Sequence, residues 1–236
     1  MPPIRTPCPQ TFVPYVYSQT ELRLLLKGTR FSQKRDACKI ESQTLRMLLL
    51  FLYGTGALTG EALRLRREDV DLKSDLVTIR GGRFNRVRRI PIGPDLHKRL
   101  RQFVDSVSQK NRSANFFANR DGSAIKARIL GKSFERLRRL SGIARHDGAR
   151  YQPRVHDLRA TFAVHRLTAW FKQGAGMNRM LPALSAYLGQ VGLGSTERYL
   201  SMTPERFRKQ LVKLSPQRRK RRWRDNPSLM KFLAEL

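Results

Sequence analysis

The chain has 236 residues, enough to bury a substantial core in one large domain or two small ones. Its 48 lysines and arginines against 18 acidic residues give a formal charge of +30, which repels itself in a compact monomer unless a polyanion screens it. Nucleic acid is therefore the favoured partner. The sequence shows no disulfide framework, no membrane-spanning run and no secretory leader, so we expect a cytoplasmic protein.

The first part of the chain predicts an extended segment followed by a short helix. Residues 1–17 are rich in proline and aromatic residues and predict an extended lead-in. Ser18 and Glu21 have the spacing of a capping box, which predicts a helix over residues 22–27. Gly28 is expected to stop this helix, because glycine commonly ends helices and a polar stretch follows it.

The polar stretch of residues 29–39 is expected to be a loop. After it, apolar residues at helical spacing and cap residues predict a succession of helices. In chain order these cover residues 41–53, 60–66, 94–107, 126–140, 157–172, 178–189 and 196–200, and a further helical segment follows Thr203. Between Asp75 and Ile92 the pattern changes to two short β-type runs around Gly81-Gly82, which predicts a hairpin or small sheet with its basic residues on the exposed face. The fold class is therefore mainly α with a small antiparallel β-sheet.

Four local patterns occur in a fixed order along the chain. Thr55-Gly56-Ala57-Leu58-Thr59-Gly60-Glu61 comes first, then the basic hairpin, then His156-Asp157-Leu158-Arg159, and then Leu188-Gly189-Gln190 with Tyr199 nine residues after Gln190. Each pattern alone is weak, but together they are specific. In this order and spacing the chain resembles the catalytic domain of the tyrosine recombinase (phage integrase) family, over roughly residues 10–215.

The resemblance implies a domain organisation. Residues 18–215 would form the catalytic domain, and the N-terminal core-binding domain that family members usually carry is expected to be absent. Residues 216–236 form a basic tail, for which three interpretations stay open. Its apolar residues could dock on a neighbouring protomer, Arg218–Arg224 could be a phosphate-binding arm, or the tail could be disordered.

The family's chemistry explains which residue types the site needs. A tyrosine attacks a DNA phosphodiester, which leaves a 3′-phosphotyrosyl bond and a free 5′-hydroxyl, and a 5′-hydroxyl of another strand reverses the step. The covalent link preserves the bond energy, so neither a metal nor another cofactor is expected. Arginines stabilise charge on the pentavalent phosphate, while a histidine and a lysine assist proton transfer.

Three of these residues are present at matching positions. Tyr199 takes the position of the nucleophile, Arg159 that of the second arginine, and His156 that of its histidine partner. The simpler interpretations are a buried helical tyrosine for Tyr199, and a helix-start histidine with a surface arginine for the other two.

The position of the first arginine carries Leu58 instead. Leucine has no hydrogen-bond donor, and by analogy with other phosphoryl-transfer arginines its presence could reduce the rate by roughly 10³–10⁵. Arg64 or Arg66 is an alternative donor, although each lies further along the chain.

Two other catalytic positions are also altered. The hairpin lysine falls on Arg83, or on Arg80 or Arg86 if the loop length differs, and arginine holds its proton too tightly to be an effective general acid. Gln190 replaces the histidine or tryptophan that family members carry in the last of the four patterns, and it can donate a hydrogen bond but cannot exchange protons.

Double-stranded DNA is the expected partner, in a homo- or hetero-multimer and without a membrane. Basic side chains of the hairpin and of residues 126–140 would contact phosphates, which fix position rather than sequence. The candidate DNA-binding residues are Arg80, Arg86, Arg88, Lys126 and Lys132.

Three functions compete. The first is site-specific DNA recombination or integration by Tyr199, as part of a prokaryotic, nucleoid-associated mobile-element recombinase. The second is a catalytically impaired DNA-binding subunit or regulator that assists an active recombinase, which Leu58, Arg83 and Gln190 favour. The third is a basic structural protein of ribosome or nucleoid.

Overall fold

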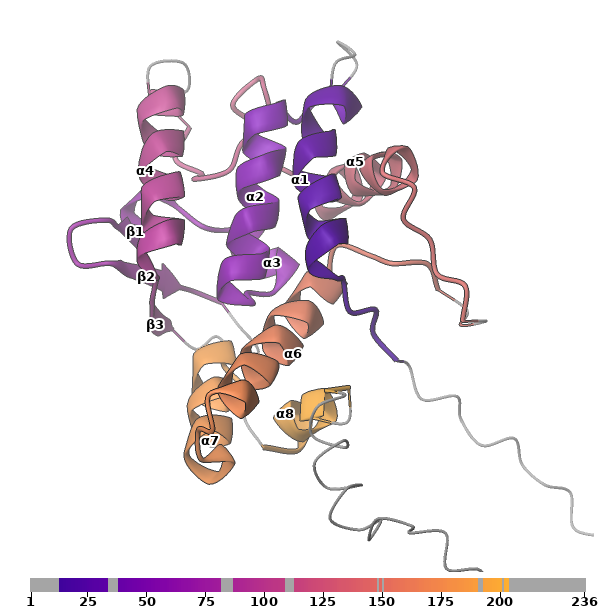
Figure 1. Cartoon of the computed structure of the whole chain (residues 1–236). Coiled ribbons are helices and arrows are strands. Elements are labelled where there is room, and N and C mark those ends of the chain that lie inside the picture. The colour runs from indigo at the N-terminus through magenta and orange to yellow at the C-terminus, as the bar shows by residue number, and fades with distance from the viewer. Residues whose placement is uncertain are drawn as a thin grey trace, which may run out of the picture.

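The structure is a computed structural model that combines eight helices with one small sheet in its described part (Figure 1). It describes residues 13–33, 38–81, 87–108, 113–147, 149, 151–190, 193–200 and 202–203. The helices are α1 (Gln19–Ser32), α2 (Ser42–Thr55), α3 (Thr59–Leu63), α4 (Pro94–Ser108), α5 (Ala127–Leu140), α6 (Asp157–Lys172), α7 (Met177–Leu188) and α8 (Leu193–Leu200), with a 3₁₀ turn η1 (Arg67–Asp69).

Helices α1, α2 and α4 lie side by side, with α5 against α1 and the sheet below α4 in the view of Figure 1. Helix α6 packs on α2, and α7 and α8 pack on α6. A large apolar core joins α1, α2, α4 and α5, and a smaller one joins α6, α7 and α8. The side chains of Tyr53 and Tyr187 pack against both cores, so the two parts share one continuous interior.

The sheet is antiparallel, with strand order β1 (Val70–Asp71), β2 (Leu76–Ile79) and β3 (Arg88–Pro91). Its register pairs Val77 with Ile90 and Ile79 with Arg88. Alternate residues of a strand point to one face, so Arg88 lies on the same face as the buried Ile90. The prediction of a mainly helical domain with a small antiparallel sheet is confirmed.

The predicted stop at Gly28 is wrong, because α1 continues through this residue to Ser32. A Cβ atom at Gly28 would lie 2.9 Å from both Leu137 Cδ1 and Ser141 Oγ at the end of α5. The glycine therefore allows α1 to approach α5 closely. Residues 29–32, expected to begin a polar loop, are therefore helical, and Thr29 and Ser32 are buried.

The end of the extended lead-in is fixed to α6 and to the segment that precedes it. Residues 13–17 have no regular secondary structure, and the Tyr17 side chain is buried. The Tyr17 backbone N–H donates to Thr161 Oγ1 at 3.0 Å, and the Tyr17 hydroxyl donates to the Arg154 carbonyl oxygen at 2.9 Å. The predicted helical segment after Thr203 and the tail, residues 216–236, lie outside the described residues.

Among the described residues, no helix combines the length and the apolar composition needed to cross a membrane. Helix α2 is rich in leucine, but it has only 14 residues. Its buried residues face the other helices of the larger core. The apolar run of α2 is therefore used for packing within the domain.

Gly56 ends α2 in the left-handed conformation, with φ of 61°, and a Cβ there would lie 2.5 Å from Phe162 Cδ1 and 2.7 Å from Leu188 Cδ2. Gly142 has a similar φ of 64° but nothing within 4 Å of a Cβ. We expect Gly142→Ala to lower the free energy of unfolding by about 1–2 kcal/mol through backbone strain. Gly56→Ala should cost about 1–3 kcal/mol more through overpacking. Urea unfolding checks this, and equal losses would contradict the predicted clash.

Candidate active site

Arg159 is fixed at the place where three helices meet. It stands in the first turn of α6, and only 7% of its surface is exposed. Its Nη1 donates to the Gly56 carbonyl oxygen at 2.7 Å, and its Nη2 donates to the Leu188 carbonyl oxygen at 2.9 Å. These oxygens lie at the C-terminal ends of α2 and α7, where carbonyls lack helical partners and carry partial negative charge. The guanidinium therefore joins both helix ends to α6.

The Tyr199 hydroxyl lies at this guanidinium. Burial lowers the pKa of Arg159, whereas the nearby Tyr199 hydroxyl and the charge of Glu61 oppose the shift. Tyr199 stands near the end of α8, is half-buried, and packs its ring on the smaller core. Its backbone carbonyl accepts a hydrogen bond from the Thr203 hydroxyl at 3.0 Å. Helix α8 thus presents the phenol to Arg159, and the structure brings these two predicted residues together.

Glu61 supplies a buried negative charge next to Arg159. Only 3% of its surface is exposed, and it forms a two-pronged ion pair with Arg88 of β3, at 2.7 Å to Nη1 and 2.8 Å to Nη2. Burial alone would raise the pKa of Glu61, but the hydrogen bonds from Arg88 and from the Leu58 N–H, with the charges of Arg88 and Arg159, outweigh burial and lower it. The carboxylate therefore stays ionised and ties the sheet to α3.

His156 is the N-cap residue of α6, lies near Arg159 and is exposed. Its pKa lies below the usual range, because the protein around the ring removes part of its hydration and because Arg159 repels a second positive charge. At neutral pH the imidazole is therefore uncharged, and it can accept or donate a proton.

Gln190 is positioned by the end of α7 and by Thr196 of α8. Gly189 has φ of 68°, and the Gln190 N–H donates to the Ser185 carbonyl oxygen at 2.9 Å, as in a Schellman-type helix ending. The buried Thr196 hydroxyl donates to Gln190 Oε1. Its oxygen is occupied by Thr196, and no hydrogen bond with another described residue uses the NH₂ group of the Gln190 amide.

Leu58 is the N-cap residue of α3, and its backbone N–H donates to Glu61 Oε2 at 2.8 Å. The two alternative donors are engaged elsewhere. Arg64 donates to the Gly81 carbonyl oxygen at 2.9 Å, and the exposed Arg66 pairs with Glu68 at 3.6 Å. Neither contact brings a guanidinium to Glu61. The predicted lysine position, Arg83, lies outside the described residues, as does Arg86.

The predicted DNA-binding residues fall into two groups. Lys126, the N-cap residue of α5, and Lys132 within α5 are both exposed. Arg80 is half exposed, and its Nε pairs with the buried Asp69 carboxylate at 2.5 Å. This ion pair links the end of β2 to the 3₁₀ turn η1. Arg88, expected on the exposed face of the hairpin, is instead largely buried and paired with Glu61.

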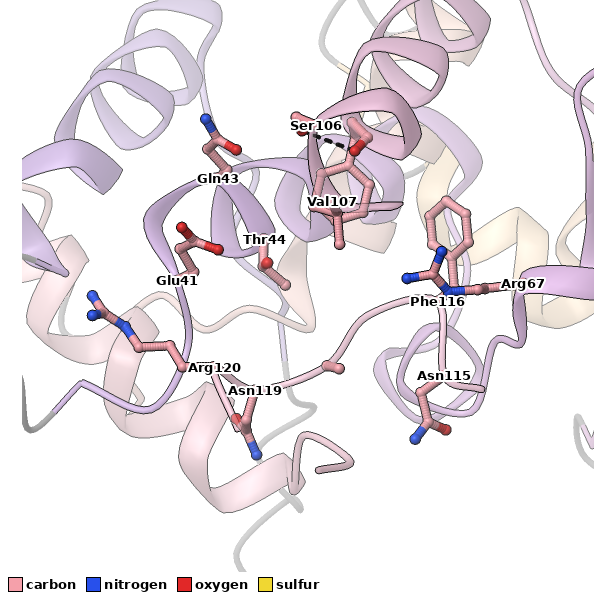
Figure 2. Close-up of a pocket in the computed structure, with 12 residues that line it drawn as sticks. Glu41, Gln43, Thr44, Arg67, Ser106, Val107, Asn115, Phe116, Asn119 and Arg120 are labelled. Carbon is pink, nitrogen blue, oxygen red and sulfur yellow. Dashed lines mark hydrogen bonds between the residues drawn. The ribbon is translucent and has the colours of Figure 1, made fainter. Parts of the chain in front are cut away.

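A separate cavity of about 210 Å³ lies away from these residues, between the start of α2, the end of α4 and the segment 115–120 (Figure 2). Its charged lining residues are Glu41, Arg67 and Arg120. None of Tyr199, Arg159, His156 and Gln190 lines this cavity. The candidate active site is therefore the junction of α3, β3, α6, α7 and α8, and this cavity plays no part in it.

Sequence reasoning missed Glu61 and Arg88 as members of the site. Glu61 served only as a landmark of the first motif, and Arg88 as a surface phosphate contact. The alternation of Arg88 with Ile90 and Ile92 was a usable signal, because residues two apart in a strand share a face. An arginine in register with buried isoleucines needs a buried partner, and Glu61 is that partner.

Solved structures with this arrangement of elements define the class. XerH recombinase bound to a palindromic difH substrate, in a post-cleavage complex, superposes with a TM-score of 0.63 at 21% identity, covering 85% of this chain and 53% of that chain. A lambda integrase tetramer bound to a Holliday junction superposes with a TM-score of 0.56 at 15% identity, covering 80% of this chain and 49% of that chain. The fold is that of a tyrosine recombinase catalytic domain.

Sequence comparison gives the family. Residues 27–205 match the phage integrase family, and the chain belongs to it. A protein of Sinorhizobium fredii (strain NBRC 101917 / NGR234), named "Putative integrase/recombinase y4rB", is 31% identical over 222 residues, which cover 92% of this chain and 69% of that protein. The chain thus spans between about half and 69% of the length of these similar proteins.

Glu61→Gln should make the protein less stable at neutral pH and less sensitive to acid. It leaves Arg88 without a carboxylate, which should lower the free energy of unfolding by about 3 kcal/mol. The native pKa of Glu61 is lowered, so its stabilisation is present above the unfolded pKa of about 4.3 and is lost as the pH falls through the native value. Urea unfolding from pH 7 to pH 3 checks both effects.

Glu135→Gln is the matched control, because Glu135 forms an exposed pair with Arg139 within α5. Its effect should stay within about 0.5 kcal/mol at every pH. Parallel pH profiles for wild type and Glu61→Gln would contradict the charge assignment of Glu61.

Proposed function

We propose that this chain cuts and rejoins DNA strands through Tyr199, as the catalytic domain of a site-specific recombinase from a prokaryotic mobile element. The observation that carries the proposal is the placement of the Tyr199 hydroxyl beside Arg159, whose guanidinium is fixed by Gly56 and Leu188. A phosphate held by this guanidinium would lie beside the phenol, and such placement of reactants is a major source of rate acceleration.

In the proposed step the Tyr199 oxygen attacks the scissile phosphorus. The bond from phosphorus to the 5′-oxygen breaks, the tyrosine loses its proton, and the leaving 5′-oxygen gains one. Arg159 and the Gln190 NH₂ group would donate hydrogen bonds to the non-bridging oxygens as charge develops on them. The uncharged His156 would relay a proton at the edge of the site, and attack by a 5′-hydroxyl of another strand would rejoin the DNA.

The proposed substrate is double-stranded DNA, bound by a multimer in the nucleoid. Support comes from the charge of +30 and from the exposed Lys126 and Lys132, which lie at the start of α5 and within it. The XerH and lambda integrase structures contain DNA, and the lambda integrase is a tetramer. Phosphate contacts by the basic residues would give affinity and position, while base contacts would give the target sequence.

Covalent capture tests the proposed chemistry without knowledge of the target. Wild-type protein is incubated with a pool of random-sequence duplexes that carry nicks, so that a cleaved strand loses its short end and cannot be rejoined. Denaturing gels should show a protein–DNA adduct, and sequencing of the captured strands should return one motif. Tyr199→Phe removes only the hydroxyl and should abolish the adduct, with DNA binding retained within about threefold.

The impaired-subunit alternative predicts a different result in the same assay. Wild type would then bind DNA without an adduct, while Leu58→Arg combined with Arg83→Lys would form one. Leu58 at the position of the family's first arginine is the observation that favours this alternative. Binding to DNA or RNA with no preferred sequence and no adduct in either protein would instead indicate a basic structural protein.

Thr196 should affect the reaction through Gln190 rather than by touching DNA. Thr196→Val keeps the shape of the side chain but removes the hydroxyl that bonds Gln190 Oε1, so the amide can rotate. We expect the adduct to form about tenfold more slowly, at a cost in stability of about 1 kcal/mol. Thr196→Ser keeps the hydroxyl and should retain the rate within about threefold. Equal rates for the valine and serine variants would remove Thr196 from this role.

A further inference from the structure

Arg88 occupies the interior of the candidate active site, although it belongs to the hairpin. Its side chain is 15% exposed. Nε donates to the Tyr187 carbonyl oxygen at 3.2 Å, and Nη1 and Nη2 donate to the two oxygens of Glu61. The guanidinium is thus oriented from two sides, by the end of α7 and by α3.

Arg88 also lies beside the position where the first arginine of the family is missing. Glu61 Oε2 accepts hydrogen bonds from both the Leu58 N–H and Arg88 Nη2, at 2.8 Å each. One carboxylate oxygen therefore holds the backbone of Leu58 and the guanidinium of Arg88 next to each other. A guanidinium is present at this end of α3, but it comes from β3 instead of from residue 58.

The backbone around Gln190 accommodates this side chain. A Cβ atom at Gly189 would lie 2.8 Å from Arg88 Nη1 and 3.0 Å from its Cζ. Gly189 therefore lets the guanidinium pack directly on the chain next to Gln190. Arg88 is in contact with Glu61 of the first sequence pattern and Gly189 of the fourth, and it repels Arg159 of the third.

The charges of this cluster call for an anion. Arg88 and Arg159 each carry a positive charge, and Glu61 carries the one negative charge that the described contacts place between them. One net positive charge is left in a largely buried site, where an anion is attracted more strongly than at an exposed surface. A phosphodiester carries one negative charge and suits this site.

We propose that Arg88 is a catalytic residue that donates to a non-bridging oxygen of the scissile phosphate, in place of the arginine that Leu58 replaces. This inference rests on the proposed function. Contacts with other described residues use three of the five N–H donors of Arg88, which leaves two for the phosphate. Glu61 is then a positioning residue. The site would have two arginines, Arg88 and Arg159, although Leu58 stands at the position of the first arginine.

Replacement of single phosphates tests this contact in a protein that cannot cleave. Tyr199→Phe protein selects a preferred duplex from a random-sequence pool by affinity. A methylphosphonate, which lacks the negative charge of a phosphate, is then placed at each position of that duplex in turn, and binding is measured. Glu61→Gln with Arg88→Met in the same background removes both ion-pair partners, so that no buried charge is left unpaired.

We expect one phosphate in each half-site at which neutralisation weakens binding about tenfold in the Tyr199→Phe protein. In the protein that also carries Glu61→Gln and Arg88→Met, the loss at that phosphate should shrink to less than about threefold, while losses at other phosphates persist. Arg89→Met is the matched control, because Arg89 is the next residue of β3 and is exposed. It should leave the loss at that phosphate unchanged. An unchanged tenfold loss at that phosphate in the protein that carries Glu61→Gln and Arg88→Met would overturn the inference.

Arg88→Lys is the second variant, in case the double substitution lowers the unfolding temperature below that of the assay. Lysine can keep the ion pair with Glu61 but lacks the planar set of donors. It should reduce the loss at the same phosphate at least twofold, and an unchanged loss would again count against Arg88. These outcomes do not depend on cleavage. Absence of a Tyr199-dependent adduct in wild type would reject the proposed chemistry alone.

Discussion

The Arg159 guanidinium, bound to the carbonyl ends of two helices, is the interaction on which the arrangement of the site depends. Gly56 and Leu188 are far apart in the sequence, and one side chain satisfies both of their carbonyl oxygens. The same guanidinium contacts the Tyr199 hydroxyl. Because the group is buried, water cannot easily replace it, so the ends of α2 and α7 and the phenol of α8 are positioned together.

Glu61 adjusts the charge of this arrangement. Two guanidinium groups repel each other in a site from which water is largely excluded, and one ionised carboxylate reduces that repulsion. Its contacts also join α3 to β3, since it binds the Leu58 N–H and Arg88 at once. The packing of a helix against a small sheet and the proposed binding of a phosphate anion thus involve the same side chain.

Local patterns in the sequence predicted most of the helices and the hairpin, because helical spacing and turn residues depend on near neighbours. They failed at Gly28, where a glycine needed for close helix packing has the same appearance as one that ends a helix. Arg88 was expected on the exposed face for a related reason, since the basic residues of a hairpin usually face solvent. Its pairing with Ile79, and its position two residues before Ile90, show that its side chain points inward. The carbonyl partners of Arg159 could not be predicted, because they arise from contacts between distant segments.

The double duty of Arg159 has a consequence for how such a protein would change over evolutionary time. A chain no longer selected for DNA cleavage would still need this arginine, since its loss would leave two helix-end carbonyls unsatisfied in the interior. No hydrogen bond within the described part of the chain gives the phenol oxygen of Tyr199 a comparable structural role, since the ring packs on the smaller core and a phenylalanine would fill the same space. Under the proposed function, tyrosine rather than phenylalanine at position 199 would therefore mark natural variants that are selected for DNA cleavage, whereas arginine at position 159 would mark only those that fold.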